Sequence, residues 1–306
     1  MAAHQDRAGR RLVILVPYLW LLVFFLVPFL IVVKISLSQI AISMPPYIPT
    51  FSLAEGWAGL VDAFRQFSFD NYLWLTEDDL YIRSYLSSLW IALVSTLIAL
   101  LVGYPIAYGM ARAPSHWRPT LLMLVILPFW TSFLIRVYAW IGILKPEGLL
   151  TVILQTVGLL SPDEQVRILN TNTAVYIGIV YSYLPFMVLP LYSALEKMDG
   201  SLLEAAEDLG CHPLKAFWVI TFPLSIPGVV AGCFLVFIPA VGEFVIPDLL
   251  GGSQTLMIGK TLWAEFFSNR DWPVSSAVAV ILLLVLIVPI VAFQRAQQRA
   301  QEREAG

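Results

Sequence analysis

The stretch SLLEAAEDLGCHPLKAFWVITFP, residues 201–223, places three acidic residues within eight positions, between two long apolar runs. The chain has 306 residues, of which 59% are hydrophobic and only 13% are charged, and its mean hydropathy is +0.80. A soluble domain normally carries about a quarter charged residues. The composition therefore predicts a membrane protein, and the polar stretch needs an explanation of its own.

The polar stretch has the local pattern of a helix, a turn and a second helix. Ser201 and Glu204 have the spacing of a capping box, in which the hydroxyl and the carboxylate bond each other's backbone amides. Gly210 tolerates the left-handed conformation that often ends a helix, and Pro213 suits the first turn of the next one. These residues predict a short helix over about 202–209, a glycine turn and a following helix.

On both sides of this stretch lie apolar runs of about 20 residues, which are long enough to cross the hydrocarbon core as helices. Six such runs are predicted, at about 12–33, 85–111, 120–144, 172–194, 224–246 and 273–293. The first run is too long for a signal peptide and no small-residue cleavage site follows it, so we expect it to stay as a span. The expected fold is an all-α membrane protein with six transmembrane helices, forming one domain over residues 1–306.

The distribution of lysine and arginine predicts which side each loop occupies, because cytoplasmic loops carry an excess of these residues. One set of flanking segments holds ten positive residues in short loops: Arg7, Arg10, Arg11, Arg112, Arg118, Lys197, Lys215, Arg295, Arg299 and Arg303. The other set spreads seven over longer loops: Lys34, Arg65, Arg83, Lys145, Arg167, Lys260 and Arg270. Both termini, and the polar stretch, are therefore expected in the cytoplasm.

The spacing within the polar stretch is more specific than a cap and a turn. Glu204-Ala205-Ala206, three residues, Gly210, nine residues, Ile220, one residue and then Phe222-Pro223 match the pattern EAA-x3-G-x9-I-x-L-P, with phenylalanine where leucine is commonest. This resembles the cytoplasmic loop of permease subunits in bacterial ATP-binding-cassette (ABC) importers. The resemblance implies a type I importer permease, in which the loop at about 197–223 docks into a groove of an ATPase subunit. Glu204, Ala205, Ala206, Gly210, Ile220 and Pro223 would then couple ATP hydrolysis to transport.

Other stretches, spread over nearly the whole chain, resemble the first permease subunit of polyamine importers, and the putrescine branch above all. They are PYLWLLVFFLVPFLIVVKISL (17–37), LPFWTSFLIRVYAWIGIL (127–144), NTAVYIGIVYSYLPFMVLPLYSAL (172–195), FIPAVGEFVIPDLLGG (237–252) and NRDWPVSSAVAV (269–280). The resemblance implies a bacterial inner-membrane subunit that helps carry putrescine, or spermidine, into the cytoplasm. It also implies three kinds of partner: a second permease subunit, two ATPase subunits that bind ATP and Mg, and a periplasmic polyamine-binding protein.

Two alternatives remain open. An importer permease for another small cation or metabolite would carry the same loop. An ion-coupled secondary transporter belongs to a different class, which typically shows internal inverted repeats; none is evident here, and this class would leave the loop unexplained.

The chain is not expected to be an enzyme or to hold a cofactor. The tripeptide GKT at 259–261 lacks the glycine that a phosphate-binding loop needs at position 254, which is Gln254, and it falls in a predicted outer loop. His4, His116 and His212 have no metal-ligand spacing, and Cys211 and Cys233 share no motif, so no metal site is expected. No basic cluster suggests nucleic acid.

A charged polyamine that leaves water needs negative or π-rich surfaces in exchange. The candidate counter-charges are Glu243 and Asp248, and the candidate aromatic faces are Trp130, Tyr138, Trp140, Tyr181 and Tyr183; Glu243 leads, followed by Trp130 and Tyr183. Glu243 is placed near the outer end of the fifth run, where it either lines the path or is an interfacial acid in water. The aromatic residues are either part of the path or ordinary interface anchors.

Arg136 lies inside the third run, and an ionisable residue in a span is a functional candidate by default. A structural ion pair, for example with a partner subunit, is the preferred interpretation over substrate contact, because a fixed positive charge hinders a cation path.

Overall fold

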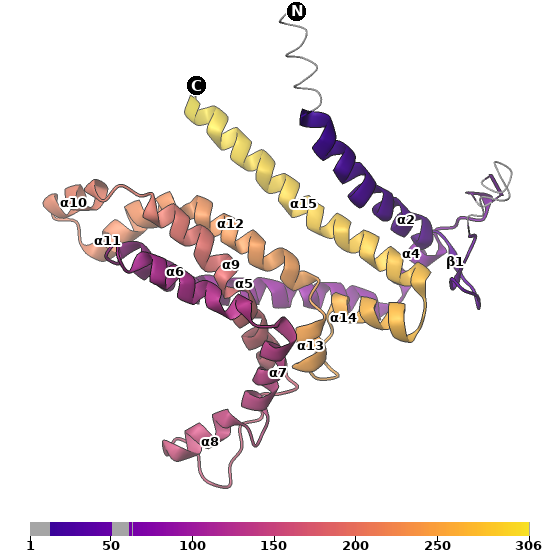
Figure 1. Ribbon diagram of the computed structural model, residues 1–306, viewed down its shortest axis with the longest axis horizontal. Coiled ribbons are helices and arrows are strands. Elements are labelled where there is room, and N and C mark those ends of the chain that lie inside the picture. The colour runs from indigo at the N-terminus through magenta and orange to yellow at the C-terminus, as the bar shows by residue number, and fades with distance from the viewer. Residues whose placement is uncertain (1–12, 51–60, 63, 306) are drawn as a thin grey trace, which may run out of the picture. The chain divides into compact units, whose positions relative to one another are not determined.

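The computed structural model describes the backbone of residues 13–50, 61–62 and 64–305 (Figure 1). Arg7, Arg10, Arg11 and the first residue of the first predicted span lie outside the described residues. The chain divides into two compact units, one made of Met1–Ile82 with Thr261–Gly306 and the other of Arg83–Lys260. A single domain over 1–306 stays a prediction.

The first unit pairs the first and last long helices of the chain. The first span is a continuous helix from Val13 to Ser36, with a π-helical turn η1 (Leu22–Leu26) followed by α2 (Val27–Ser36). Helix α15 (Trp272–Ala305) packs along α2, and the ends of the two helices nearest the chain termini lie on the same side (Figure 1).

Short elements of the first unit follow the end of α2 and precede α15. Strands β1 (Gln39–Ile40) and β2 (Tyr47–Ile48) form an antiparallel hairpin, and α4 (Asp70–Glu77) packs on α15. A π-helical turn η5 (Ala264–Ser268) leads into α15, whose first turn is capped by Asp271, since its carboxylate accepts from Val274 N at 3.0 Å.

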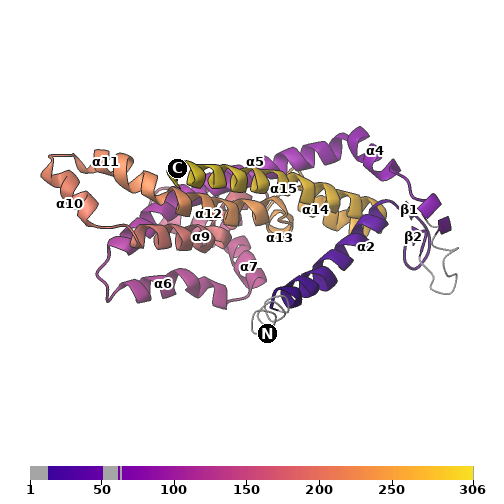
Figure 2. The ribbon, with the colours of Figure 1, turned by 90° about the horizontal axis from the view of Figure 1, so that it is seen from above.

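The second unit is built on three long helices: α5 (Asp79–Arg112, which enters from the first unit), α9 (Asn172–Glu196) and α12 (Phe222–Val241). Helices α9 and α12 lie side by side in both views (Figures 1 and 2). Buried residues of all three helices form one core: Ala99, Tyr104, Ala107, Met110, Ala111, Met187, Val188, Leu191, Tyr192, Leu195 and Val236. The prolines in these helices remove backbone hydrogen bonds. Helices in a membrane tolerate this loss because neighbouring helices and side chains satisfy the freed backbone groups.

Small residues allow α12 to approach α9 closely. A Cβ atom built on Gly228 would lie 2.7 Å from the Ala194 Cβ atom and 2.8 Å from the Pro190 carbonyl oxygen. Both distances are far inside van der Waals contact, and the carbonyl is backbone that cannot rotate away. In membranes, where lipid is as apolar as leucine, such close packing supplies much of the association between helices.

We therefore expect Gly228→Ala to destabilise the protein, by about 1–3 kcal/mol as for other overpacked sites. Gly109→Ala is the matched control, because Gly109 also lies in a long helix and nothing lies within 4 Å of its added Cβ atom. That change should leave stability unchanged or raise it, since alanine is the better helix former. The measurement is the apparent melting temperature in detergent; equal values for the two variants would contradict the close-packing argument.

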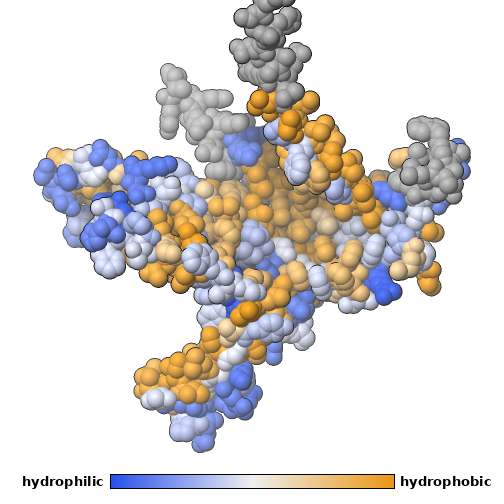
Figure 3. Space-filling view, in the orientation of Figure 1, coloured by the Kyte–Doolittle hydropathy of each residue, from blue (hydrophilic) through white to orange (hydrophobic). Residues whose placement is uncertain are grey.

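Within the described residues, four helices are long and apolar enough to cross a membrane: Val13–Ser36, Asp79–Arg112, Asn172–Glu196 and Pro213–Val241. A bent pair of helices would be a fifth span, and the apolar part of α15 over Trp272–Val288 matches the sixth predicted run. Apolar surface covers much of the helices, while hydrophilic residues gather at the α10–α11 end of the second unit (Figure 3). The all-α membrane prediction is confirmed.

Two predicted spans differ in detail from the structure. The third, predicted as one helix over 120–144, is broken into α6 (Arg118–Ile126) with a 3-10 turn η3 (Leu127–Trp130), and α7 (Phe133–Leu144), bent by 89°. The break follows from Pro128 and from the extended backbone at Thr131 and Ser132, where ψ is 152° and 136°. Helix α8 (Leu149–Thr156) follows α7.

The fifth span, predicted over 224–246, begins and ends at earlier residues than predicted. It runs as one helix from Pro213 to Val241, through α11 (Pro213–Ala216), a π-helical turn η4 (Phe217–Thr221) and α12. After it come a three-residue connector, the short helix α13 (Val245–Leu249) and α14 (Ile258–Trp263). Pro247 lies in the first turn of α13, where no amide hydrogen is needed.

Candidate functional site

The polar stretch forms helix α10 (Ser201–Asp208), a glycine turn and α11, at one end of the second unit (Figures 1 and 2). Gly210 has φ +74°, its amide donates to Glu207 O at 2.8 Å, and the Cys211 amide donates to Ala206 O at 2.9 Å. These two bonds and the left-handed glycine make a Schellman motif, which satisfies the last carbonyls of the helix. The predicted glycine turn is confirmed.

The predicted capping box is wrong. Ser201 is the first residue of α10, the N-cap is Gly200, and no side chain caps the helix there. Instead the Asp199 carboxylate accepts from the Ser201 amide at 3.0 Å, and this bond lowers the pKa of Asp199 because it favours the charged carboxylate. Glu204 is thus released from local capping and is exposed.

The surface of this loop mixes acids with exposed leucines. Glu204 and Ala205 are exposed, whereas Ala206 is buried against the rest of the loop. Leu209 is 87% exposed and Leu214 is 68% exposed. His212 caps α11 by accepting from the Leu214 amide at 3.3 Å. The loop therefore holds a fixed shape while it presents apolar side chains to the outside.

The coupling loop is continuous with the fifth span. Ile220 lies in the π-helical turn and Pro223 in the first turn of α12, so the second half of the motif belongs to the long helix. At 1.5 Å per residue, the 29 residues of Pro213–Val241 span about 43 Å. The helix ends two residues before Glu243.

Glu243 lies in the connector after α12, and its predicted position within a helical span is wrong. Its side chain accepts three hydrogen bonds, from Tyr183 Oη at 2.5 Å, Val245 N at 3.0 Å and Ile246 N at 3.3 Å. The carboxylate thus lies at the N-terminus of α13, where the free amides favour negative charge. It is only 8% exposed, so it is not an acid in open water.

Glu243 and Tyr183 line a cavity of about 470 Å³ in the second unit. Its other walls come from the bent pair, α9 and the α12–α13 connector: Phe129, Phe133, Arg136, Ser182, Phe186, Pro239, Gly242, Phe244 and Val245. Phe129, Phe133 and Phe186 were missed in the sequence. The sequence held only a weak signal for them. Phe129 adjoins Pro128, and Phe186 lies three residues after Tyr183, so Phe186 and Tyr183 share one face of a helix.

The other predicted path residues do not join this cavity. Trp130 is 70% exposed and Tyr138 is 58% exposed. Trp140 packs edge to face on Tyr181, with ring centroids 5.3 Å apart. Asp248 lies 3.7 Å from the Lys260 ammonium, in an ion pair near the surface. The geometry joins only Glu243 and Tyr183 of the predicted set.

Arg136 also lines the Glu243 cavity, but no ion pair of either side chain is found in the part of the chain that the structure describes. Its guanidinium instead donates to backbone carbonyl oxygens at the break of the bent pair. The cavity lining therefore includes one carboxylate and one guanidinium, and among the described residues these two do not form an ion pair.

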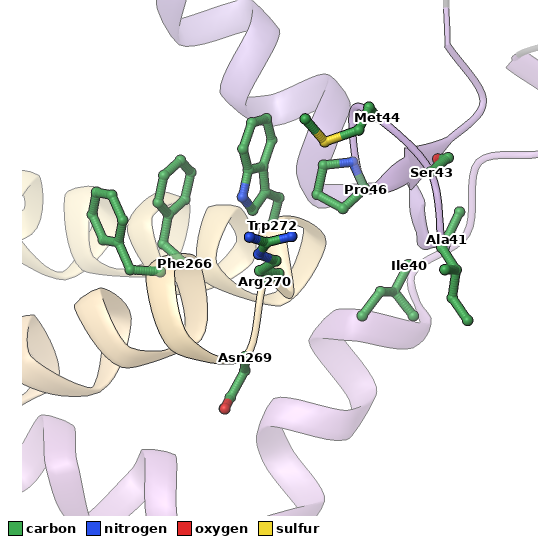
Figure 4. A pocket seen from close by; sticks show the side chains of 11 residues that line it. Ile40, Ala41, Ser43, Met44, Pro46, Phe266, Asn269, Arg270 and Trp272 are labelled. Atoms are coloured by element: carbon green, nitrogen blue, oxygen red, sulfur yellow. The ribbon is translucent and has the colours of Figure 1, made fainter.

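A second cavity, also of about 470 Å³, lies in the first unit between the β1–β2 turn and the segment that leads into α15 (Figure 4). Its walls are largely apolar, with Met44, Phe266 and Trp272 among them, and its one charged side chain is Arg270. A cavity whose charge is positive gives an ammonium no counter-charge, so the Glu243 cavity is the better candidate for a cation.

Among the described residues, no group of three or more His, Cys, Asp or Glu side chains could hold a metal ion. Cys211 and Cys233 are free thiols.

Residues 6–303 match the family model described as binding-protein-dependent transport system inner membrane component. The chain is 40% identical over 291 residues to the spermidine/putrescine transport system permease protein PotB of Haemophilus influenzae, covering 94% of both chains. It is 45% identical over 232 residues to PotB of Escherichia coli, covering 76% of this chain and 83% of that one.

Among solved structures, a chain of a bacterial ABC transporter that imports the acidic polysaccharide alginate matches with a TM-score of 0.70 and 17% identity, covering 98% and 99% of the two chains. The chain belongs to the family of binding-protein-dependent transport system inner membrane components, and its fold is that of an ABC importer permease.

Proposed function

We propose that this chain is the permease subunit through which an ABC importer carries polyamines, putrescine and spermidine, into the cytoplasm. The relatives named above, at 40% and 45% identity, are spermidine/putrescine permeases. The fold alone does not select the substrate, because the alginate importer shares it and handles an acidic polymer. The choice of substrate therefore has to be argued from the chemistry of the Glu243 cavity.

The observation that carries the proposal is the buried Glu243 carboxylate without a cation partner in the described chain. A carboxylate has about four acceptor positions, and three are used by Tyr183, Val245 and Ile246. One acceptor position remains for an ammonium group. The phenylalanine rings that line the same cavity suit the methylene chain of a polyamine.

The loop that would couple ATP hydrolysis to transport lies at the other end of the helix that precedes Glu243. In this proposal Glu204, Ala205, Ala206 and Gly210 dock on an ATPase subunit, and the exposed leucines of the loop become buried there. Closure of two ATPase subunits on ATP and Mg displaces the loop. The continuous helix Pro213–Val241 supports this view, since it links the docking surface with the connector that holds Glu243.

The remaining partners follow from the same proposal. A second permease subunit completes the path across the bacterial inner membrane, and a periplasmic binding protein delivers the polyamine to the outer face. Both termini lie in the cytoplasm, on the side of the coupling loop, as the excess of lysine and arginine indicates. ATP hydrolysis belongs to the separate ATPase subunits.

The test is uptake of labelled putrescine by proteoliposomes that contain the assembled complex and its binding protein. We expect ATP-dependent uptake, with unlabelled putrescine and spermidine competing and a small inorganic cation not competing. The isolated chain in the same vesicles should hydrolyse no ATP and import nothing, because its coupling loop has no partner. If the complex takes up another cation and polyamines do not compete, the substrate is not a polyamine. Activity of the isolated chain would overturn the proposal as a whole.

A further inference from the structure

Arg136 occupies the inner angle of the bent pair of helices. Its guanidinium donates to the carbonyl oxygen of Pro128, in η3, and to that of Thr131 at 3.1 Å, in the break between η3 and α7. The Pro128 carbonyl oxygen also accepts from the Thr131 amide at 3.3 Å and from the Thr131 hydroxyl at 2.8 Å, so Arg136 adds to a cluster of hydrogen bonds at the break. A side chain of α7 thus bonds backbone groups of η3 and of the break, across an 89° bend.

The same guanidinium also lies over two aromatic rings. Its central carbon is 5.3 Å from the ring centroid of Phe129, in η3, and 5.9 Å from that of Phe133, in α7. These distances fall within the range of cation–π contacts. Arg136 therefore joins the two halves of the bent pair through side chains as well as through backbone.

Phe129 and Phe133 are walls of the Glu243 cavity. Phe129 packs edge to face on Phe186 of α9, with ring centroids 5.2 Å apart, and Phe186 in turn lies 6.2 Å from the ring of Tyr183. Tyr183 donates to Glu243. A chain of contacts therefore runs from the break, through Phe129 and Phe186, to the carboxylate.

We infer that Arg136 is a positioning residue of the transport site: it holds the break of the bent pair so that Phe129 and Phe133 wall the Glu243 cavity. This inference rests on the proposed function for its effect on uptake. Arg136 does not bind the substrate itself, because a guanidinium repels an ammonium group. Lysine is a poor substitute, since its compact ammonium cannot lie flat on two rings and bridge two carbonyls as a planar guanidinium does.

The first experiment measures the geometry of the break without any transport. Spin labels at Leu124 in α6 and Ile135 in α7, which are 58% and 67% exposed, report the distance across the bend in the assembled complex. The background carries Cys211→Ser and Cys233→Ala. We expect one narrow distance distribution, a broad one in Arg136→Gln and an intermediate one in Arg136→Lys. An unchanged distribution in Arg136→Gln would overturn the inference.

The second experiment tests whether Arg136 acts through the aromatic wall. Arg136→Gln should lower putrescine uptake roughly tenfold, the size of coupling expected for contacting residues. Arg167→Gln, which removes an exposed arginine from another loop, is the matched control and should transport like wild type. Copurification of all subunits shows that each complex is assembled.

A double-mutant cycle separates positioning from direct action. In a Phe129→Ala, Phe133→Ala background, Arg136→Gln should lower uptake further by less than about twofold, because the wall that it positions is already gone. A full additional loss would show direct action and overturn the inference. If the wild-type complex takes up no putrescine, the proposed function fails, while the distance measurement still decides the role of Arg136 at the break.

Discussion

Replacing Glu243 with glutamine is expected to lower putrescine uptake by about tenfold to a hundredfold, because hydrogen bonds to charged groups contribute about 1.5–3 kcal/mol and 1.4 kcal/mol is a factor of ten. Glutamine has nearly the same shape, and its amide group can still bond Tyr183 and the α13 amides that Glu243 bonds now. The change therefore removes the charge while it leaves the local packing in place. The measurement is labelled uptake by vesicles that carry each variant at matched expression.

Asp248→Asn is the matched control for this experiment. It removes a carboxylate only five residues away, but Asp248 is exposed at the surface and already paired with Lys260. We expect a small loss, mainly through weaker capture of the cation, that fades as salt rises, since salt screens exposed charges. Wild-type uptake by Glu243→Gln would show that the cavity is not on the substrate path; equal losses in the two variants would point to the overall charge of this region instead.

Changes in the coupling loop are expected to abolish ATP-driven uptake altogether. Glu204→Lys reverses the charge of an exposed motif residue that makes no local cap, so its effect must come through a partner. Gly210→Val places a β-branched residue at φ +74°, where such residues are genuine outliers, and so breaks the turn that holds α10 against α11. The measurements are uptake and ATP hydrolysis stimulated by the substrate-loaded binding protein.

Glu207→Lys provides the control for the charge reversal, because it makes the same change on the same helix, also at an exposed position, but outside the motif. It should retain most of the uptake. Membrane insertion is checked by protease protection, which should be the same in all three variants. Normal uptake in Glu204→Lys together with Gly210→Val would exclude the docking role, and loss in Glu207→Lys to the same degree would assign it to the acidity of α10 as a whole.

Local sequence patterns predicted the helical elements well, because hydrophobic length and turn chemistry act over a few residues. Runs of about 20 apolar residues have few alternatives to a helix in a membrane. Gly210 and Pro213 likewise mark the turn and the next helix, as the structure confirms. The capping box failed for a related reason: Asp199, two residues earlier, competes for the first amides of α10, and the S-x-x-E pattern does not reveal such a competitor.

The broken elements could not be predicted from apolar length, because a hydropathy window does not register a bend. Residues 120–144 are largely apolar, yet the chain turns by 89° within them. Pro128 marks where a break is allowed, but prolines also lie inside α9 and α12 without any such bend. At the break, Pro128 O accepts from the Thr131 amide, the Thr131 hydroxyl and the Arg136 guanidinium, and a hydropathy window does not register such hydrogen bonds.

The sequence by itself determined the class of this protein: a polytopic membrane helix bundle with a polar coupling loop of a particular spacing. Only the tertiary structure decided which candidate side chains share one site. Glu243 and Tyr183 lie 60 residues apart and meet through a 2.5 Å hydrogen bond, whereas Trp130, Tyr138, Trp140 and Asp248 remain apart from them. The physical reason is that spacing along the chain controls local helices and turns, while the meeting of distant side chains depends on how α9 packs against α12 and α13, and that packing is set by the shapes of many residues at once.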